Sequence, residues 1–195
     1  MKILVTGSAG QLASAIVREF WGVADVLALS RAQLDIADSR AVSDRVRAEK
    51  PDAIVNCAAY NDVDGAEGEP AASLTANAFG VRTLGRAAGE IGASFVHYST
   101  DFVFDGRASR PYSEEDAPNP LGVYASSKLI GEWFALEVPR ALVLRVESLF
   151  GGRPAKSSID RIVEAIASGR EAKVFVDRTV SPSYVDDVAA ATRVL

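Results

Sequence analysis

Short, nearly continuous apolar runs alternate along this chain with longer stretches in which apolar residues recur at helical spacing. Runs of this kind are typical of parallel strands covered on both faces, because neither face of such a strand meets water. The longer stretches have the pattern of amphipathic helices. The alternation predicts an α/β fold built on a doubly wound parallel sheet. The expected strands are residues 2–6, 25–29, 53–56, 94–99, 141–146 and 173–176, and the expected helices include residues 10–20, 39–49, 71–91 and 121–136.

Length and composition narrow the class of protein. The 195 residues, 48% of them hydrophobic, suit one α/β domain or one domain with part of a second. The net charge of −5 gives no electrostatic footprint for nucleic acid, and no window reaches the length of a membrane span. The single cysteine, Cys57, favours a reducing cytoplasm. The single histidine, His97, excludes a multi-histidine metal centre, and we expect no metal and a structural role for this residue.

The first expected strand runs directly into a turn in which Gly7, Gly10 and Ala13 follow one another at three-residue intervals. Glycines permit a tight turn and a close approach of the backbone to a pyrophosphate, and a small residue lets the next helix pack closely on the sheet. An ordinary strand–helix turn could also use glycine. The position after the first strand of an α/β alternation favours a dinucleotide site of the Rossmann-like, NAD(P)-binding kind.

The end of the second expected strand bears on the choice of cofactor. An acid there accepts a hydrogen bond from a ribose 2′-hydroxyl, whereas an arginine pairs with a 2′-phosphate. This chain has Ser30 and Arg31 at that place, and the first later acid is Asp35. The pattern favours NADPH, with NADH as the alternative. A solvated surface arginine is the other interpretation of Arg31.

Tyr124 and Lys128 are spaced so that they share one face of a helix. An ammonium beside a phenol favours the ionised form, so we expect Lys128 to lower the pKa of Tyr124 from its usual value of about 10. Thr100 follows the fourth expected strand, at the edge where open α/β sheets bind ligands. A tyrosine and a solvated lysine at a helix start are the alternative, but the order of glycine turn, threonine, tyrosine and lysine favours proton transfer coupled to hydride transfer.

Two further segments flank this pattern. The third expected strand ends in small residues, which would let a cofactor lie across the end of the strand. Close packing in the core is the alternative explanation for the small residues. Cys57 in this run has the setting of a small buried hydrophobe rather than a nucleophile. Residues 105–120 contain glycine and several prolines and predict a loop, where a lid or wall of a substrate site could lie.

Taken together, these residues resemble an extended short-chain dehydrogenase/reductase. Within that group the chain is similar to the dTDP-4-dehydrorhamnose reductases and their sugar-nucleotide-binding relatives. The similarity covers essentially the whole chain and is most specific at residues 99–106. The other matching segments are residues 7–12, 34–38, 56–60, 63–67, 77–80, 119–128, 144–145 and 181–187.

The resemblance implies NADPH-dependent reduction of a nucleotide-linked 4-keto-6-deoxy sugar, of the dTDP-4-dehydrorhamnose to dTDP-L-rhamnose type, for polysaccharide precursors. Thr100, Tyr124 and Lys128 match the family's catalytic trio. The match implies that Tyr124 gives a proton to the keto oxygen, Lys128 holds the nicotinamide ribose and Thr100 orients the carbonyl. The matching cofactor positions are Gly10, Gln11, Leu12, Asp35, Ile36, Ala58, Ala59 and Tyr60, beside Gly7, Ser30 and Arg31.

On the substrate side, the resemblance implies contacts from Thr100, Asp101 and Ser148. The family usually has a Thr-Ser-Trp-like run after Arg145, and this chain instead has Val146-Glu147-Ser148. We expect an NAD(P)-binding domain over residues 1–150 and, over residues 151–195, the truncated start of a sugar-nucleotide-binding part. A homodimer in the cytoplasm, with no nucleic-acid or membrane partner, is the expected setting.

The resemblance leaves two other functions open. One is a non-catalytic NADP-binding subunit, like the regulatory subunit of methionine adenosyltransferase, which the missing tryptophan keeps in view and the intact trio opposes. The other is a sugar-nucleotide dehydratase or epimerase. Dehydratases of this class place an acid directly after the Thr-Asp pair, and this chain has Phe102 there.

Overall fold

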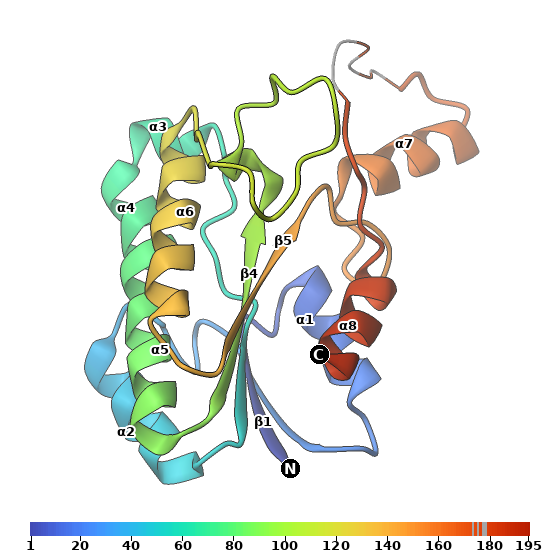
Figure 1. Cartoon of the computed structure of the whole chain (residues 1–195). Helices are drawn as coiled ribbons and strands as arrows, with labels where there is room; N and C mark the ends of the chain where they lie inside the picture. Colours follow the sequence, from blue (N-terminus) through green and yellow to red (C-terminus); the bar gives the residue numbers. More distant parts are fainter. Residues whose placement is uncertain (173, 175, 177–178) are drawn as a thin grey trace.

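The computed structural model describes residues 1–172, 174, 176 and 179–195. Its centre is a five-stranded parallel sheet in the order β2-β1-β3-β4-β5 (Figure 1). The first five expected strands are confirmed, with β4 one residue longer than predicted. The sixth, over residues 173–176, falls partly outside the described residues. The strands are β1 (Lys2–Thr6), β2 (Asp25–Leu29), β3 (Ala53–Asn56), β4 (Ser94–Thr100) and β5 (Ala141–Val146).

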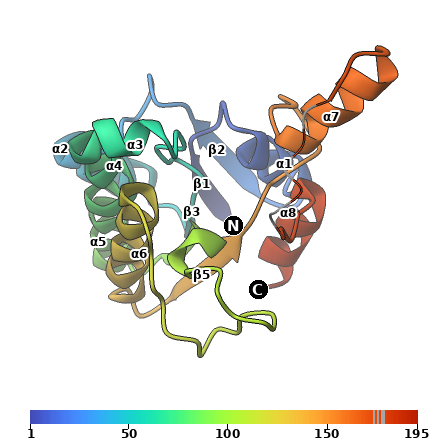
Figure 2. The ribbon, with the colours of Figure 1, turned by 90° about the horizontal axis from the view of Figure 1, so that it is seen from above.

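Helices cover both faces of the sheet, which confirms the doubly wound arrangement. On one face lie α2 (Ser39–Glu49), α5 (Gly80–Ile91) and α6 (Val123–Leu136), and on the other α1 (Gln11–Glu19) and α8 (Val185–Val194) (Figures 1 and 2). The helix α7 (Ser158–Ala167) extends outward beyond α1 and α8. Within the described residues, none of these helices combines the length and the apolar character that a membrane crossing requires.

Alternate residues of each strand enter different halves of the core. In β1, Leu4 packs with the side chains of α2 and α5, whereas Ile3 and Val5 pack with those of α1 and α8. All three are almost completely buried. This burial on both faces explains why the strands are continuous apolar runs in the sequence.

The long helix predicted over residues 71–91 is interrupted. Two short helices, α3 (Gly65–Gly68) and α4 (Pro70–Leu74), lead into a π-helical turn over Thr75–Phe79, and α5 follows without a break. The buried Asn77 lies in this turn, and its side chain accepts from the backbone N–H of Tyr60 and donates to the carbonyl of the same residue. The irregular turn therefore fixes the backbone that follows β3.

Backbone pairing after β5 brings the C-terminal part of the chain back to the sheet. Ser183 donates to the carbonyl of Glu147 (2.9 Å), and Phe150 donates to the carbonyl of Ser183 (3.1 Å). Val185 and Ala189 of α8 then enter the same core cluster as α1. Part of the segment 151–195 thus packs on the first 150 residues, whereas the domain boundary expected at residue 150 stays a prediction.

Candidate active site

The glycine turn joins β1 to α1 where the ends of β1 and β3 come very close. Gly7 has φ +70°, and a Cβ on it would lie 2.7 Å from the backbone nitrogen of Ala58. Gly10 precedes α1 and provides no side-chain cap, so no side chain occupies the first N–H groups of that helix. A close backbone approach and an uncapped helix start are the features that suit a bound phosphate.

The side chains of Gln11 and Leu12 already contact other parts of the protein. Gln11 donates to the carbonyl of Gly151 and to the carboxylate of Asp160 (3.3 Å), so it connects the start of α1 to the segment around α7. Leu12 is buried in the core. A phosphate in this turn would meet their backbone N–H groups.

The loop after β2 presents Arg31 and Asp35 side by side. The Arg31 side chain is exposed, and its Nε lies 3.2 Å from the Asp35 carboxylate. The Ser30 hydroxyl and backbone N–H donate to Gln33 (2.9 Å each). The side chain of Ile36 is buried in the core, so the predicted contact with a cofactor would have to come from its backbone, and it stays a prediction.

After β3, the backbone of residues 58–60 is held by side chains rather than by a helix. Ala58 donates its N–H to the Asn56 side chain (3.1 Å), and Tyr60 donates its phenol to Glu69 (3.2 Å). Ala58, Ala59 and Tyr60 are all half-buried. The segment passes directly beside the glycine turn, as the contact of Gly7 with Ala58 requires.

Thr100, Asp101 and Tyr124 converge at the end of β4. The Thr100 hydroxyl donates to the Asp101 carboxylate (3.0 Å), and Thr100 lies near enough to the Tyr124 phenol to lower its pKa. The Tyr124 ring, at the start of α6, meets the ring of Phe102 edge-on at 6.1 Å. The structure therefore brings together a hydroxyl, a phenol and a carboxyl that are separate in the sequence.

Burial shifts the pKa of both acids in this cluster. The pKa of Tyr124 is raised to about 12, chiefly by burial, with the Thr100 side chain opposing the rise and the charge of Asp101 adding to it. The pKa of Asp101 is raised to about 6 by burial and by the negative charge of Glu147. The phenol therefore stays protonated at neutral pH.

Lys128 lies one turn after Tyr124 on α6, as predicted, but its effect on the phenol is not the expected one. Its Nζ is buried and donates to the backbone carbonyl of Tyr98 (2.6 Å). Burial lowers the pKa of Lys128 to about 8, opposed by Glu132 and Cys57. The prediction that Lys128 lowers the pKa of Tyr124 is wrong for this structure, because burial of the phenol dominates and Lys128 is not among the groups that shift it.

An ion pair behind Lys128 was not predicted. Glu132, one further turn along α6, is almost fully buried and accepts two hydrogen bonds from Arg145 of β5 (2.6 and 2.9 Å). The Arg145 guanidinium lies 4.8 Å from the centre of the Phe104 ring, which stacks on Tyr112 at 4.3 Å. An acid four residues after a buried lysine is the sequence signal that could have indicated this network.

Residues 105–120 form the expected irregular loop, beyond the tip of β4 (Figure 1). The loop is held by its own side chains. Asp105 accepts from Tyr112 and Asn119, and its pKa is lowered to about 2 by these and by the N–H of Arg107. Arg110 and Asp116 form an ion pair within the loop. An ordered loop at this place can serve as a wall of a substrate site.

His97 lies in the core, in keeping with the structural role predicted for it, and the side chain of Cys57 is half-buried. Burial raises the pKa of Cys57 to about 12, so the thiol is not activated. His97 is fully buried, and its Nδ1 accepts from Asn56, whose oxygen in turn accepts from Thr6 (2.6 Å). These three side chains tie β1, β3 and β4 together. Ser148 is exposed just after β5, with φ +42°, and its predicted contact with a substrate stays a prediction.

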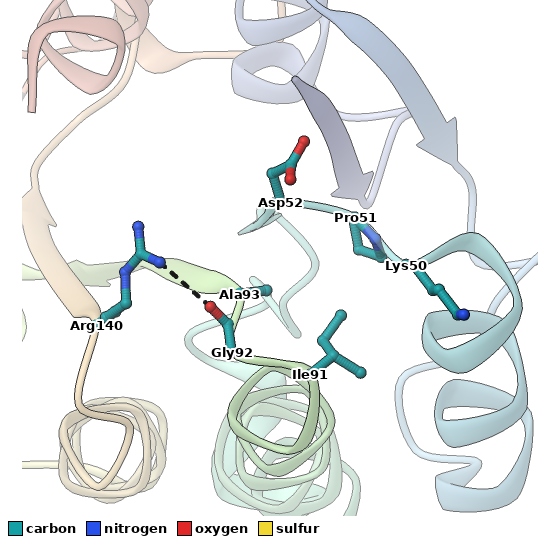
Figure 3. Close-up of a pocket in the computed structure, with 7 residues that line it drawn as sticks. All are labelled: Lys50, Pro51, Asp52, Ile91, Gly92, Ala93 and Arg140. Atoms are coloured by element: carbon teal, nitrogen blue, oxygen red, sulfur yellow. Dashed lines mark hydrogen bonds between the residues drawn. The ribbon is translucent and has the colours of Figure 1, made fainter.

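A hollow lies at the opposite, amino-terminal edge of the sheet (Figure 3). Arg140 there donates to the carbonyl of Gly92 (3.3 Å). None of the predicted site residues lines this hollow. The lining residues are Lys50, Pro51, Asp52, Ile91, Gly92, Ala93 and Arg140.

Comparisons with known proteins identify the family of this chain. A family model described as the RmlD substrate binding domain matches residues 1–195. The chain is 39% identical over its whole length to a dTDP-4-dehydrorhamnose reductase of Mycobacterium tuberculosis and 34% identical to one of Sinorhizobium fredii. It spans 65% and 66% of the length of these relatives.

Solved structures give the same result. A dTDP-4-dehydrorhamnose reductase from Bacillus anthracis, in complex with NADP, superposes with a TM-score of 0.94 at 30% identity, over 98% of this chain and 69% of that one. One from Clostridium acetobutylicum superposes with a TM-score of 0.94 at 33% identity, over 99% and 69%. The resemblance inferred from the motifs is confirmed, and the chain belongs to the RmlD substrate binding domain family.

Proposed function

We propose that this chain is the cofactor-binding and catalytic part of an NADPH-dependent reductase of a nucleotide-linked 4-keto-6-deoxy sugar, of the dTDP-4-dehydrorhamnose type. The observation that carries the proposal is the meeting of Thr100, Asp101 and Tyr124 at the end of β4, with Lys128 one helical turn away. The names of the relatives support the same substrate class.

The residues at the carboxyl edge of the sheet fit a dinucleotide. The uncapped start of α1 would hold its pyrophosphate, and the contact of Gly7 with Ala58 leaves room for no side chain between them. The exposed Arg31 would pair with a 2′-phosphate, and the NADP bound to the Bacillus anthracis relative supports NADPH over NADH. Once bound, the reduced nicotinamide would supply hydride to the carbonyl carbon.

The chain's own residues would supply the proton that the keto oxygen needs. Tyr124 keeps its proton at neutral pH because burial raises its pKa to about 12, so it would donate that proton to the keto oxygen as negative charge develops there. Thr100 would orient the carbonyl from the end of β4. Lys128, one helical turn after Tyr124, would hold the ribose hydroxyls of the cofactor.

Phe102 distinguishes the reductase from a dehydratase. Its ring packs edge-on against Tyr124, in the position after the Thr-Asp pair where the dehydratase alternative requires an acid. A phenyl ring there has no proton to give or take and cannot assist loss of a hydroxyl. This packing supports the reductase as the leading function.

The wider organisation follows from the same proposal. Residues 1–150 would carry the cofactor and the catalytic groups, and residues 151–195 would begin the sugar-nucleotide-binding part, with Ser148 at the junction. The protein would act in the cytoplasm on a small nucleotide-linked substrate, as a homodimer and without a nucleic-acid or membrane partner.

The test is oxidation of NADPH by the purified protein in the presence of dTDP-4-dehydrorhamnose, followed by nicotinamide absorbance. The expected result is oxidation that depends on the keto sugar nucleotide, with a dTDP-6-deoxyhexose product identified by mass spectrometry. Binding of NADPH without turnover of this substrate, or of a panel of nucleotide-linked keto sugars, would contradict the proposal.

A further inference from the structure

Two segments that match the family pattern have no role in the proposed reaction. Residues 63–67 and 77–80 contain none of the groups proposed to touch the substrate or the cofactor. They lie in and around α3, α4 and the π-helical turn, and these three elements pack against α6 (Figures 1 and 2). This part of the chain is therefore placed to hold the helix that carries Tyr124.

The backbone N–H group just before Tyr124 is held by Glu67. Gly122 precedes α6 and provides no side-chain cap, so the first N–H groups of the helix need partners from elsewhere. The Glu67 carboxylate, on α3, accepts from the backbone N–H of Val123 (2.7 Å). A Cβ on Gly122 would lie 2.8 Å from this carboxylate, so a glycine there lets the acid come near. A negative charge suits a helix start, because the free N–H groups carry partial positive charge.

The backbone carbonyl of Tyr124 is held by a buried polar cluster. The Ser127 hydroxyl donates to this carbonyl (2.7 Å) and lies 2.9 Å from the hydroxyl of Ser73 in α4. Asn77, in the π-helical turn, donates to the Ser127 oxygen (3.0 Å). The side chains of Ser73, Asn77 and Ser127 are all buried. Since its one proton goes to Tyr124, the Ser127 oxygen accepts from both neighbours, and its hydroxyl has a single orientation.

We propose that Glu67 and Ser127 are positioning residues that fix Tyr124 at the end of β4. This inference rests on the proposed reductase function and adds how its proton donor is held in place. Both residues act through the backbone of α6 and not through the substrate. A proton donor must lie within hydrogen-bond reach of the keto oxygen, and a displacement of about 1 Å can cost roughly 100-fold in rate.

The fold of α6 does not depend on Glu67. The helix is anchored in the protein by buried apolar side chains such as Ala125, Leu129 and Ala135, whereas Glu67 is exposed. Loss of the Glu67 side chain should therefore leave the protein folded and release only the first turn of the helix. This makes Glu67 the safer of the two residues to substitute.

Two variants remove the contacts one at a time. Glu67→Ala frees the N–H of Val123, and Ser127→Ala frees the carbonyl of Tyr124. Each should lower kcat by about tenfold, with the KM for NADPH close to that of the parent. Glu67→Gln keeps an oxygen that can accept from Val123, so this conservative variant should restore kcat.

The matched controls lie on the same helix. Ser126 adjoins Ser127 and is half-buried, and Glu137 is exposed at the opposite end of α6. Ser126→Ala and Glu137→Ala should leave kcat unchanged. An unchanged kcat in Glu67→Ala or in Ser127→Ala, or equal losses in the controls, would overturn the proposal.

A measurement without turnover separates this inference from the reductase function. The rings of Tyr124 and Phe102 meet edge-on with their centres 6.1 Å apart, so their protons should show a nuclear Overhauser effect in NMR spectra. The effect should weaken in Glu67→Ala and Ser127→Ala and persist in the controls. Its persistence in Glu67→Ala and Ser127→Ala would overturn the positioning role even if the protein reduces the sugar. Its weakening in both, in a protein that reduces no nucleotide sugar, would contradict the reductase function alone and support the positioning of Tyr124.

Discussion

The two edges of the same sheet carry polar residues of similar kinds in very different settings. At the amino-terminal edge, Lys50 and Arg140 are exposed around a hollow, and Asp52 accepts from the backbone N–H of Lys2. At the carboxyl edge, Tyr124 is half-buried and Lys128 buried, and both have shifted pKa values. The comparison shows that a hollow alone does not identify an active site in this protein. The candidate site is identified by buried polar groups that lie close enough to shift one another's pKa.

Tyr124→Phe should have the largest effect on turnover. Loss of the proton donor should lower kcat by about 10²–10⁴-fold, with NADPH affinity nearly unchanged, since the ring and its contact with Phe102 remain. Arg140→Ala, at the other edge, should leave kcat as it is. Steady-state kinetics of the two variants measure the contrast, and a comparable loss in Arg140→Ala would break the comparison of the edges.

Glu132→Gln should have the largest effect on stability. Removal of the buried carboxylate leaves Arg145 without its partner and should lower the free energy of unfolding by about 3 kcal/mol. It should also lower the pKa of Lys128 further, because Glu132 raises it. Urea unfolding measures the first effect.

An exposed ion pair provides the matched control for Glu132→Gln. Glu90→Gln breaks the pair of Glu90 with Arg47, both solvent-exposed, and should cost less than about 1 kcal/mol. Equal losses in Glu132→Gln and Glu90→Gln would contradict the role given to burial.

Gly7→Ala should lower both stability and cofactor affinity. The added methyl group would meet the backbone of Ala58, and φ is positive, so we expect a cost of about 2 kcal/mol in unfolding free energy. Gly22→Ala has the same positive φ but open space around it, and should cost about 1 kcal/mol with unchanged NADPH binding. If both variants bind NADPH like the parent, the glycine turn does not hold the cofactor.

Arg31→Ala should have the smallest effect, confined to cofactor choice. Loss of a charge-assisted contact at an exposed site should weaken NADPH binding by about tenfold and leave NADH binding unchanged. Arg40→Ala is the matched control, because Arg40 is also exposed and pairs with an acid four residues later. Calorimetry gives both dissociation constants, and equal losses for the two cofactors would make Arg31 a surface residue only.

The fold could be predicted well because each parallel strand corresponds to a local pattern in the sequence. Each is a short apolar run. A continuous run such as Ile3 to Val5 is typical of a parallel strand that is buried on both faces. The π-helical turn at Thr75–Phe79 was missed because its cause is a distant contact, the bonds of Asn77 to Tyr60. Periodicity carries no information on such a contact.

The arrangement of the candidate site could be predicted from the sequence, and its electrostatics could not. The position of Tyr124 and Lys128 on one helix follows from their spacing, and their proximity to Thr100 follows from strand order. The pKa of Tyr124 depends on burial and on Asp101, and the coupling of Asp101 to Glu147 joins residues 46 positions apart (147 − 101). The side chain of Ile36, a predicted cofactor position, lies in the core, and its contact with a cofactor stays a prediction.

The most direct test of the central claim is transfer of deuterium from NADPH labelled on the nicotinamide to dTDP-4-dehydrorhamnose, with the nucleotide-sugar product read by mass spectrometry and NMR. The account predicts one deuterium per product, on the carbon that was the ketone, and its near-complete loss in Tyr124→Phe under single-turnover conditions. A protein that binds the labelled cofactor yet leaves every nucleotide sugar unlabelled would contradict it.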